Sequence, residues 1–363
     1  MTARVPNHGR RPAAPPVSPD EPLPVPASDH PRGDAAGPGR ESARLVTEPG
    51  AQALGRHATA PAQIPWLGWK AVLRRTFAEM LTDRVSLVAA GCAFYATLAL
   101  FPAISTFISV YGMVFDPTTV EPQLEVLRSL LPPAAYALIA QRVDLLVRQP
   151  PTTLGLHLLL SSAVALWSST TGVKSILAAL NLAYEERESR SVLQYQLISF
   201  TITIVAMVSV VIGLALLVGL PALLASLGIV SHQNGLLRAA SFGLLMLALL
   251  TGLSLLYRYG PSRERPQWQW VTPGSIVATV LWVAVSVSFS FYVEQFATYD
   301  ATYGPLGTVV AIMMWFFVTV YAVLLGAELN AELELQTARD STDGPPQPLG
   351  DRGAYVADHV AED

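Results

Sequence analysis

Six long apolar stretches decide what this chain can fold into. Each approaches or exceeds the roughly 20 residues that an α-helix needs to cross the hydrocarbon core of a bilayer. A soluble core does not need apolar runs of this length. Only 14% of the residues are charged, against about 25% in soluble proteins. The sequence therefore predicts an all-α integral membrane protein with six transmembrane helices. The predicted spans are residues 85–115, 153–173, 194–220, 236–257, 271–293 and 306–328.

Arginine and lysine set the predicted orientation, because basic residues collect on the cytoplasmic side of membrane proteins. Lys174, Arg187 and Arg190 follow the second predicted span, and further basic residues follow the fourth. The loops at 226–235 and 294–305 contain neither lysine nor arginine. We therefore predict that both termini lie in the cytoplasm.

Both ends of the chain differ in composition from the predicted membrane domain, residues 64–339. Residues 1–63 are rich in proline and alanine, and residues 340–363 are polar and acidic. Segments of this kind bury too little apolar surface to offset the entropy lost on ordering. We predict that both tails are disordered.

Two further segments have helical periodicity without being apolar enough to span. Residues 66–84 predict a basic amphipathic helix in the membrane interface, with an ordinary packing helix as the alternative. Its apolar stripe consists of Trp69, Leu73, Phe77 and Met80. The loop at 116–152 predicts two short amphipathic helices, separated by the pair Pro132-Pro133.

Several motifs resemble those of the YihY/BrkB family of bacterial inner-membrane proteins. In chain order they are AAGCAFYATLALFPA (89–103), ALNLAYEERESR (179–190), LYRYGP (256–261), WVTPGSIVATVLW (270–282), YDATYGPLG (299–307), LLGAELNAELE (324–334) and DRGAYVAD (351–358). The resemblance implies a multi-pass protein of the bacterial cytoplasmic (inner) membrane, with six spans and both termini inside. It also implies links to virulence and to export of lipids or lipopolysaccharide precursors. The family was formerly labelled ribonuclease BN, and the resemblance supplies no catalytic residues.

Residues that catalysis or cofactor binding would need are missing or dispersed. The six histidines form no ligand-spaced pair, and there is no GxxxxGK[ST] or GxSxG motif. A net charge of −4 implies no general affinity for nucleic acid. We therefore expect no enzyme activity, no metal, no cofactor and no nucleic-acid partner, and the ribonuclease label finds no support. Enzymatic modification of a lipid stays open as an alternative.

The motif LLGAELNAELE places Glu328 at the end of the last predicted span. One interpretation is a solvated helix end. The other is that Glu328 faces the bundle and pairs with Arg258 or Lys174, because an ionised carboxylate without a partner is costly there. Glu328 and Glu332 are spaced by four residues and share one helical face. Asn330 and Glu334 form a second such pair, and we expect Glu334 to lie in water.

The first and last spans contain a candidate substrate path. Pro102 is expected to kink the first span, and Gly304 belongs to a turn or broken helix start before the last one. The residues expected to line the path are Tyr95, Thr97, Tyr299 and Tyr303. Interface anchoring by the last two, and helix packing at Thr97, are the alternatives. Asp300 or Thr302 is expected to cap the last span, with a broken segment that lines the path as the alternative. Asn181, after the second span, completes the candidates.

The most direct functional interpretation is transport or flipping of a lipid or another amphipathic envelope component. The rival is a membrane scaffold that recruits partners without transporting anything. Membrane lipids are the expected partners, together with a second copy of the chain or another envelope protein. A polar-lined cavity open to one leaflet would favour transport, whereas a solid packed bundle would favour the scaffold.

Overall fold

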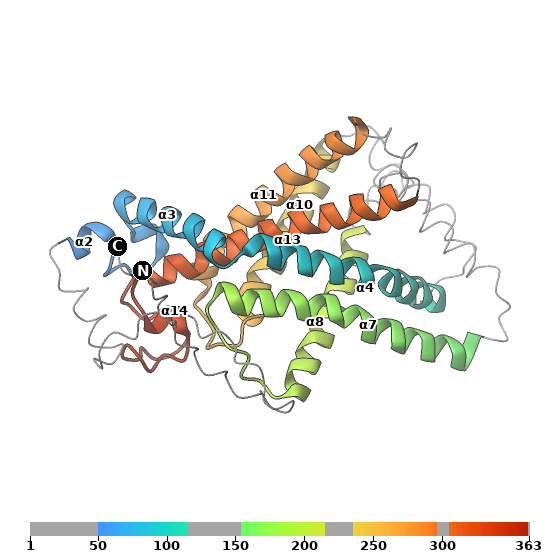
Figure 1. Ribbon diagram of the computed structural model, residues 1–363, viewed down its shortest axis with the longest axis horizontal. Helices are drawn as coiled ribbons and strands as arrows, with labels where there is room; N and C mark the ends of the chain where they lie inside the picture. The colour runs from blue at the N-terminus through green and yellow to red at the C-terminus, as the bar shows by residue number, and fades with distance from the viewer. Residues whose placement is uncertain (1–49, 115–153, 215–234, 296–304, 362–363) are drawn as a thin grey trace, which may run out of the picture. The chain divides into compact units, whose positions relative to one another are not determined.

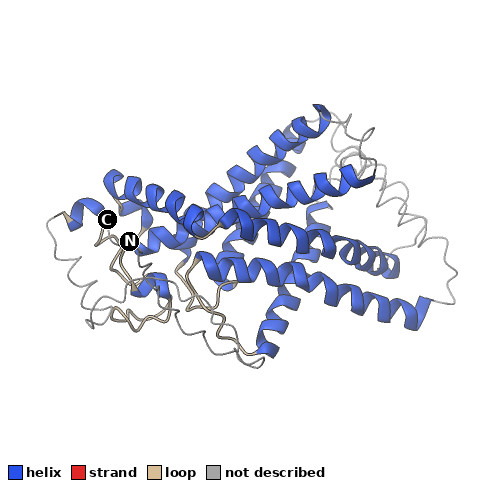
Figure 2. Ribbon diagram, in the orientation of Figure 1, coloured by secondary structure: helices blue, strands red, loops and turns tan. Residues whose placement is uncertain are grey.

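The computed structural model describes residues 50–114, 154–214, 235–295 and 305–361. Regular structure in these ranges is helical, apart from one isolated β-bridge between Pro266 and Thr342. Figures 1 and 2 show the helices and the connections between them. The predicted all-α class is confirmed.

Six long helices coincide with the six predicted spans. They are α4 (Val85–Val114), α7 (Leu154–Ala183), α8 (Val192–Leu214), α10 (Gly235–Tyr259), α11 (Trp268–Gln295) and α13 (Pro305–Leu335). Within the described residues, α8, α10, α11 and α13 are long and apolar enough to cross a membrane. Helices α3 (Trp66–Thr82) and α4 are bent by 62° at their junction, and together they form a fifth candidate span if this bent pair is treated as a single span. Four to five candidate spans are therefore present, and the count of six and the orientation stay predictions.

The long helices contact one another as a ring. Packed neighbours run in the order α8, α7, α4, α13, α11 and α10, and α10 returns to α8 through the sparsest contact of the ring. Helix α13 also contacts α3, α7 and α14 (Tyr355–Asp358), so it is the most widely connected element (Figure 1). Among the described residues, α13 therefore has the most neighbouring elements, whereas α8 packs on α7 and only sparsely on α10.

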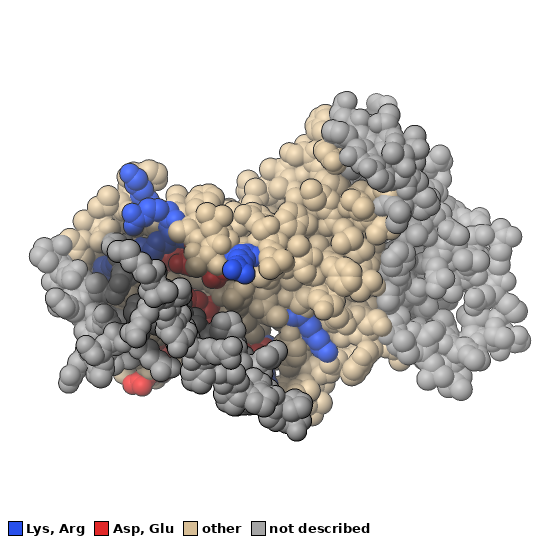
Figure 3. Space-filling model, in the orientation of Figure 1, with Lys and Arg blue, Asp and Glu red and all other residues tan. Residues whose placement is uncertain are grey.

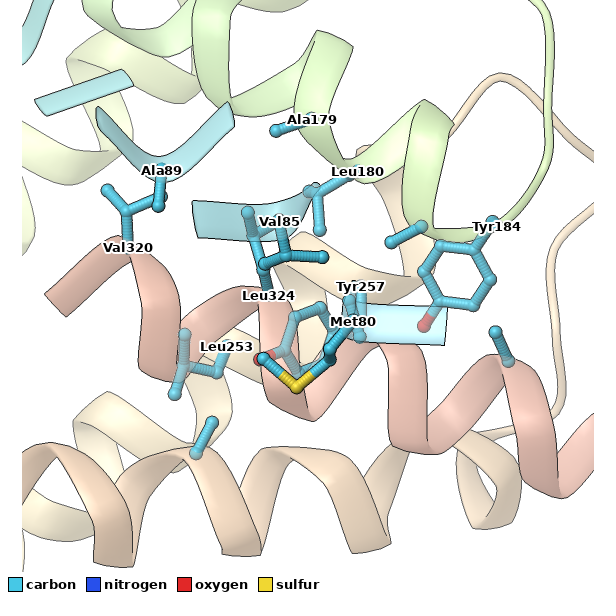
Figure 4. Close-up of a cluster of buried hydrophobic side chains, with 14 of the residues drawn as sticks. Met80, Val85, Ala89, Ala179, Leu180, Tyr184, Leu253, Tyr257, Val320 and Leu324 are labelled. Carbon is cyan, nitrogen blue, oxygen red and sulfur yellow. The ribbon is translucent and has the colours of Figure 1, made fainter. Parts of the chain in front are cut away.

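The main buried apolar cluster lies where α3 meets α4 and where α7, α10 and α13 pass that junction (Figure 4). Its largest fully buried side chains include Leu180, Tyr184, Tyr257 and Leu324. By contrast, α8 and α11 expose large apolar side chains along their length, including Ile204, Val205, Val208, Val280, Val287 and Phe291. Extended apolar surface of this kind is stable next to lipid rather than water.

Helix α3 packs on one side and exposes apolar side chains on the other. The buried side consists of Gly68, Val72, Thr76 and Met80, and a Cβ on Gly68 would collide with the carbonyl oxygen of Leu54. The exposed side carries Trp66, Leu73, Phe77 and Leu81. The predicted stripe is therefore split between the two sides, because the smaller residues are the ones that permit close contact with the domain. Placement of α3 in the membrane interface stays a prediction.

The expectation of disorder is wrong for the described parts of both tails. Residues 50–63 include α2 (Ala51–Leu54) and a 3-10 turn, η1 (Pro61–Gln63). Residues 340–361 fold back on the end of α13, where the buried side chain of Arg352 donates hydrogen bonds to the carbonyls of Ala338 and Ala357. Composition misses this order because it comes from specific hydrogen bonds and from the burial of a few small apolar side chains, such as Ala58 and Val356, in the clusters of the membrane domain. Residues 1–49 lie outside the described residues, as do both predicted helices of 116–152.

Candidate functional site

The polar residues at the end of α13 are buried. Glu328, Asn330, Glu332 and Glu334 are 3%, 0%, 4% and 1% exposed. The interpretation of this stretch as a solvated helix end is therefore wrong, and Glu334 does not lie in water. The reason is that α13 continues to Leu335 and is covered by α3, α11 and the C-terminal segment. We call these four residues and their partners the polar hub.

Asn330 repairs an interruption in α11. Pro273 has no N–H to donate within that helix. The next N–H, of Gly274, donates to Oδ1 of Asn330 at 2.8 Å, and Nδ2 of Asn330 donates to the carbonyl of Val271 at 3.1 Å. One amide thus satisfies a donor and an acceptor of a neighbouring helix, which holds α11 and α13 in a fixed register.

Glu332 and Glu334 each pair with an arginine from another element. Arg75 of α3 contacts Glu332 at 2.6 Å and also donates to Gln336. Arg263, in the α10–α11 loop, contacts Glu334 at 2.6 Å with both side chains fully buried. Burial opposes the charge on Arg263, but Glu334 outweighs this effect and raises the pKa of the guanidinium. Both pairs tie α13 to its neighbours.

Arg263 and Glu334 have further partners that complete this part of the hub. The guanidinium of Arg263 lies over the ring of Tyr184, 4.4 Å from its centroid. Ser341 donates a hydrogen bond to the second carboxylate oxygen of Glu334 at 2.7 Å. The buried pair therefore links the end of α7, the α10–α11 loop, α13 and the C-terminal segment.

Asn181 and Arg258 join the hub at its edge. Asn181 accepts a hydrogen bond from the N–H of Ser262 at 2.8 Å and donates to Glu188. Arg258 donates to the carbonyl of Pro266, pairs with Asp343 at 2.7 Å and stacks on Trp268. Both candidates therefore have structural partners across a connection between helices.

Glu328 does not have either partner that the sequence suggested. Arg258 pairs with Asp343, and Lys174 donates to Gln196. Within the described residues, Oε1 of Glu328 has no hydrogen-bond partner, and the charged groups around it include the carboxylates of Asp83 and Glu332. The prediction that Glu328 faces the bundle is confirmed, whereas its predicted salt bridge is wrong.

A second polar feature lies between α7 and α8, and sequence reasoning missed it. We call it the polar seam, formed by Thr170 and Lys174 of α7 with Gln196, Ser199 and Thr203 of α8. Nζ of Lys174 donates to Oε1 of Gln196 at 2.5 Å, and Trp167 meets Phe200 edge to face. These contacts show which faces of the two helices meet. The helical spacing of 3.6 residues puts all five seam residues on those faces.

The hydroxyls of the seam are buried although they lie on apolar helices. Thr170 and Ser199 are 0% exposed and Thr203 is 4% exposed. Each donates to a carbonyl of its own helix, at 2.6–2.7 Å. Their oxygen lone pairs remain able to accept a hydrogen bond. At the edge of the seam, Trp167 and Leu197 are 58% and 57% exposed, so the polar stripe borders the lipid-facing surface.

The candidate path residues are not brought together by the described structure. Tyr95 is 44% exposed on α4, and Thr97 is buried and donates to the carbonyl of Ala93. Pro102 lies within α4, but its side chain is outside the described residues. The other candidates, Tyr299, Asp300, Tyr303 and Gly304, are outside them as well.

Charge is distributed unevenly over the molecule. On the face drawn in Figure 3, most charged side chains lie toward the end that carries α3, and the helical surface beyond it shows few. Arg75 and Arg263 pair with carboxylates of the hub, and Arg258 and Arg352 pair with Asp343 and Asp340 of the C-terminal segment. The sequence contained one indication of the contact between Asn330 and α11. A proline followed by glycine, Pro273-Gly274, lies inside a predicted span, and a neighbouring helix must satisfy the backbone groups that the proline leaves free.

Comparison with known proteins assigns the chain to a family. The model of the family "Virulence factor BrkB" matches residues 76–349. A putative ribonuclease-like protein, YfkH of Bacillus subtilis, is 30% identical over 72% of this chain and 94% of its own length. UPF0761 membrane proteins of Methylibium petroleiphilum and Tolumonas auensis are 26% and 28% identical, over 74% and 69% of this chain and 62% and 81% of their own lengths. No solved structure matches. This chain therefore belongs to the BrkB family of membrane proteins.

Proposed function

We propose that the protein moves a lipid or another amphipathic envelope component across the membrane, with the polar seam as the path of the headgroup. The observation that carries this proposal is the row of buried polar side chains between α7 and α8, bordered by the exposed side chains of Trp167 and Leu197. A seam of this kind offers a polar route to the headgroup while the acyl chains stay in lipid.

The energetic problem of such transport is the headgroup. Moving an unpaired hydroxyl or amide into an apolar medium costs several kcal/mol, roughly 2–7 for one group. Hydroxyl oxygens of Thr170, Ser199 and Thr203 lie along the seam and would replace part of the lost hydration. Their hydrogen bonds to backbone carbonyls leave acceptor sites free, so they can accept hydrogen bonds from the hydroxyl or ammonium groups of a passing headgroup without unfolding the helix.

The arrangement of helices supports the same function. The polar hub fixes the ends of α3, α7, α11 and α13 through buried pairs and Asn330. Helix α8 contacts α7 but only sparsely contacts α10. Movement of α8 away from the fixed helices would widen the seam. The contacts that such movement must break include the hydrogen bonds of Lys174 and Tyr195 between α7 and α8.

We place the protein in the bacterial cytoplasmic membrane with six spans and the hub on the cytoplasmic side. The support is the concentration of arginine in the hub, since basic residues collect on that side. Arg75 and Arg263 make ion pairs within the hub, and Arg190, Arg258 and Arg352 make hydrogen bonds in the connections that adjoin it.

A scaffold is the second candidate, and the exposed apolar side of α3 favours it. Trp66 and Leu81 are 77% and 80% exposed there, and a partner protein could cover them, as could a second copy of the chain. The name of the Bacillus subtilis relative raises RNA cleavage as a further alternative. Among the described residues no group of three His, Cys, Asp or Glu is arranged to hold a metal ion, so the geometry gives that alternative no support.

Reconstitution tests the proposal. The purified full chain would be placed in liposomes with headgroup-labelled lipids, and the movement of label between leaflets would be followed. We expect faster movement than in protein-free liposomes. Rates that equal the protein-free value for anionic, zwitterionic and isoprenoid lipids alike would contradict transport and leave the scaffold.

A further inference from the structure

We infer that Lys174 and Gln196, at the hub end of the polar seam, bind the phosphate of an anionic membrane lipid. The inference deepens the proposed function by naming its substrate class, and it rests on that function for the consequence of binding. The binding itself is a separate property and is tested separately below.

At Lys174 and Gln196 there are more hydrogen-bond donors than acceptors. Nζ of Lys174 carries three N–H groups and donates one hydrogen bond, to Oε1 of Gln196 at 2.5 Å. Within the described residues no carboxylate pairs with Lys174, and Nε2 of Gln196 is buried without a hydrogen-bond partner. A buried donor without an acceptor is unfavourable, because it has lost its hydrogen bonds to water and gained none in return. An acceptor-only anion satisfies the amide and neutralises the ammonium.

Neighbouring side chains hold the ammonium and the amide in place. The ammonium of Lys174 lies over the ring of Trp167, 5.6 Å from its centroid, where the face of the ring attracts a cation. The hydroxyl of Tyr195 donates to the backbone carbonyl of Lys174 at 2.9 Å and fixes α8 against α7. The two donors are therefore positioned before any ligand arrives.

A helix start adds to the favourable charge. Gln196 lies in the second turn of α8, which begins at Val192. Ser191 and Gln194 cap this start reciprocally, each backbone N–H bonding the other side chain at 3.1 and 3.3 Å. Partial positive charge at a helix N-terminus favours anions. It reinforces the site, which rests on Lys174 and the free donor of Gln196.

The surroundings select a lipid as the source of the phosphate. Leu193 and Leu197 are 69% and 57% exposed beside the site, and Trp167 is 58% exposed. Exposed apolar side chains on a membrane helix face acyl chains. A phosphodiester in the headgroup of a lipid can reach Lys174 while its chains pack on these residues, whereas free phosphate gains nothing from them.

The lysine content of the chain permits a direct test of binding. Lys70 and Lys174 are the two lysines of the sequence, and Lys70 is exposed on α3. The full chain with Lys70→Arg, in nanodiscs, would be treated with an amine-reactive reagent, and the modification of Lys174 followed by peptide mass spectrometry. Zwitterionic lipid would be compared with zwitterionic lipid containing phosphatidylglycerol, and with zwitterionic lipid plus inorganic phosphate.

We expect phosphatidylglycerol to slow the modification of Lys174. At about ten times its Kd the lipid would slow it about tenfold, because only the unoccupied fraction reacts. Inorganic phosphate should have no such effect. The variant Gln196→Leu, in the same Lys70→Arg chain, should lose the protection while its unfolding temperature shows that it is folded.

The control is Lys70 in a Lys174→Gln chain, which reports the effect of anionic surface charge on an exposed lysine. Equal protection of both lysines, or no protection of Lys174, overturns the site. Equal protection by inorganic phosphate overturns the lipid as its ligand. If Lys174 were protected but the protein did not move lipids, the proposed transport function would be wrong and the lipid-binding site would stand. If Lys174→Gln moved anionic lipid at an unchanged rate, the site would not belong to the transport path, although transport itself would stand.

Discussion

Gly274 of α11 and Gly326 of α13 meet backbone to backbone. A Cβ built on Gly274 would collide with the carbonyl oxygen of Gly326, and a Cβ on Gly326 would lie 2.6 Å from both the carbonyl oxygen of Gly274 and the hydroxyl of Tyr257. Small residues permit such close helix contacts in membranes. Asn330 lies one turn along α13 from this contact and bonds the same stretch of α11.

The contact predicts that Gly326→Ala destabilises the protein. Overpacking of this kind costs about 1–3 kcal/mol, and here rigid backbone atoms would have to move. The matched control is Gly252→Ala in α10, where a Cβ would meet nothing within 4 Å. That change should be neutral or stabilising by up to about 1 kcal/mol, because alanine favours helix. Thermal unfolding in detergent measures both, and equal unfolding temperatures would contradict the close contact.

The hub predicts opposite outcomes for two neighbouring glutamates. Glu334→Gln removes the buried partner of Arg263, and breaking such a pair costs about 3–5 kcal/mol. Glu328→Gln replaces a carboxylate that has an unpartnered oxygen and carboxylates around it, so it should be neutral or stabilising. Unfolding temperatures at pH 7 compare the two. A larger loss for Glu328→Gln would show that this carboxylate has a stabilising partner.

Attachment of the C-terminal segment should weaken in acid. Burial pushes the pKa of Asp340 upward, but hydrogen bonds from Gln347 and Thr342 and the charge of Arg352 outweigh it and lower the pKa. A carboxyl with a lowered pKa stabilises the folded state above its unfolded pKa, about 3.9, and this stabilisation is lost as the pH falls through the lower folded value.

We therefore expect hydrogen exchange in residues 340–361 to accelerate below about pH 4, after correction for the intrinsic rate. Asp340→Asn, which has no charge to lose, should exchange faster at neutral pH and show less additional acceleration in acid. The same pH response in both proteins would mean that another group controls the attachment.

Orientation can be tested with single cysteines in a Cys92→Ala background. Cysteines at Gln233 and Thr298, in the loops without basic residues, should react with an impermeant thiol reagent on whole cells. A cysteine at Glu264 should react after permeabilisation. This exposed position is more informative than Ser262 in the same loop, which is buried. Labelling of position 264 on intact cells would contradict the proposed orientation.

Hydropathy was enough to locate the long helices but not to define their ends. Helices α7 and α13 continue 10 and 7 residues beyond the predicted spans, which ended at 173 and 328. In these extensions charged and amide side chains appear while the helix persists, because those side chains find partners inside the protein rather than in water. Span prediction detects the loss of hydropathy and cannot detect those partners.

Pairing in the hub could not be predicted, because it depends on which elements meet. Nothing in the sequence distinguishes the three arginines. In the structure Arg75 pairs with Glu332, Arg258 with Asp343 and Arg263 with Glu334. The seam was missed for a related reason. Lys174 and Gln196 are 22 residues apart in the sequence, and their proximity becomes visible only when α7 and α8 are packed.

The central claim is that headgroups pass along the polar seam, and Thr203 and Thr201 of α8 test it most directly. Each hydroxyl donates to the carbonyl four residues earlier, but Thr203 is buried in the seam and Thr201 is exposed away from it. Valine replaces either hydroxyl with a methyl group of similar size. The measurement is the rate of lipid movement in liposomes containing equal amounts of folded protein. The account predicts a slower rate for Thr203→Val and an unchanged rate for Thr201→Val, and equal rates for both variants and the original protein would contradict it.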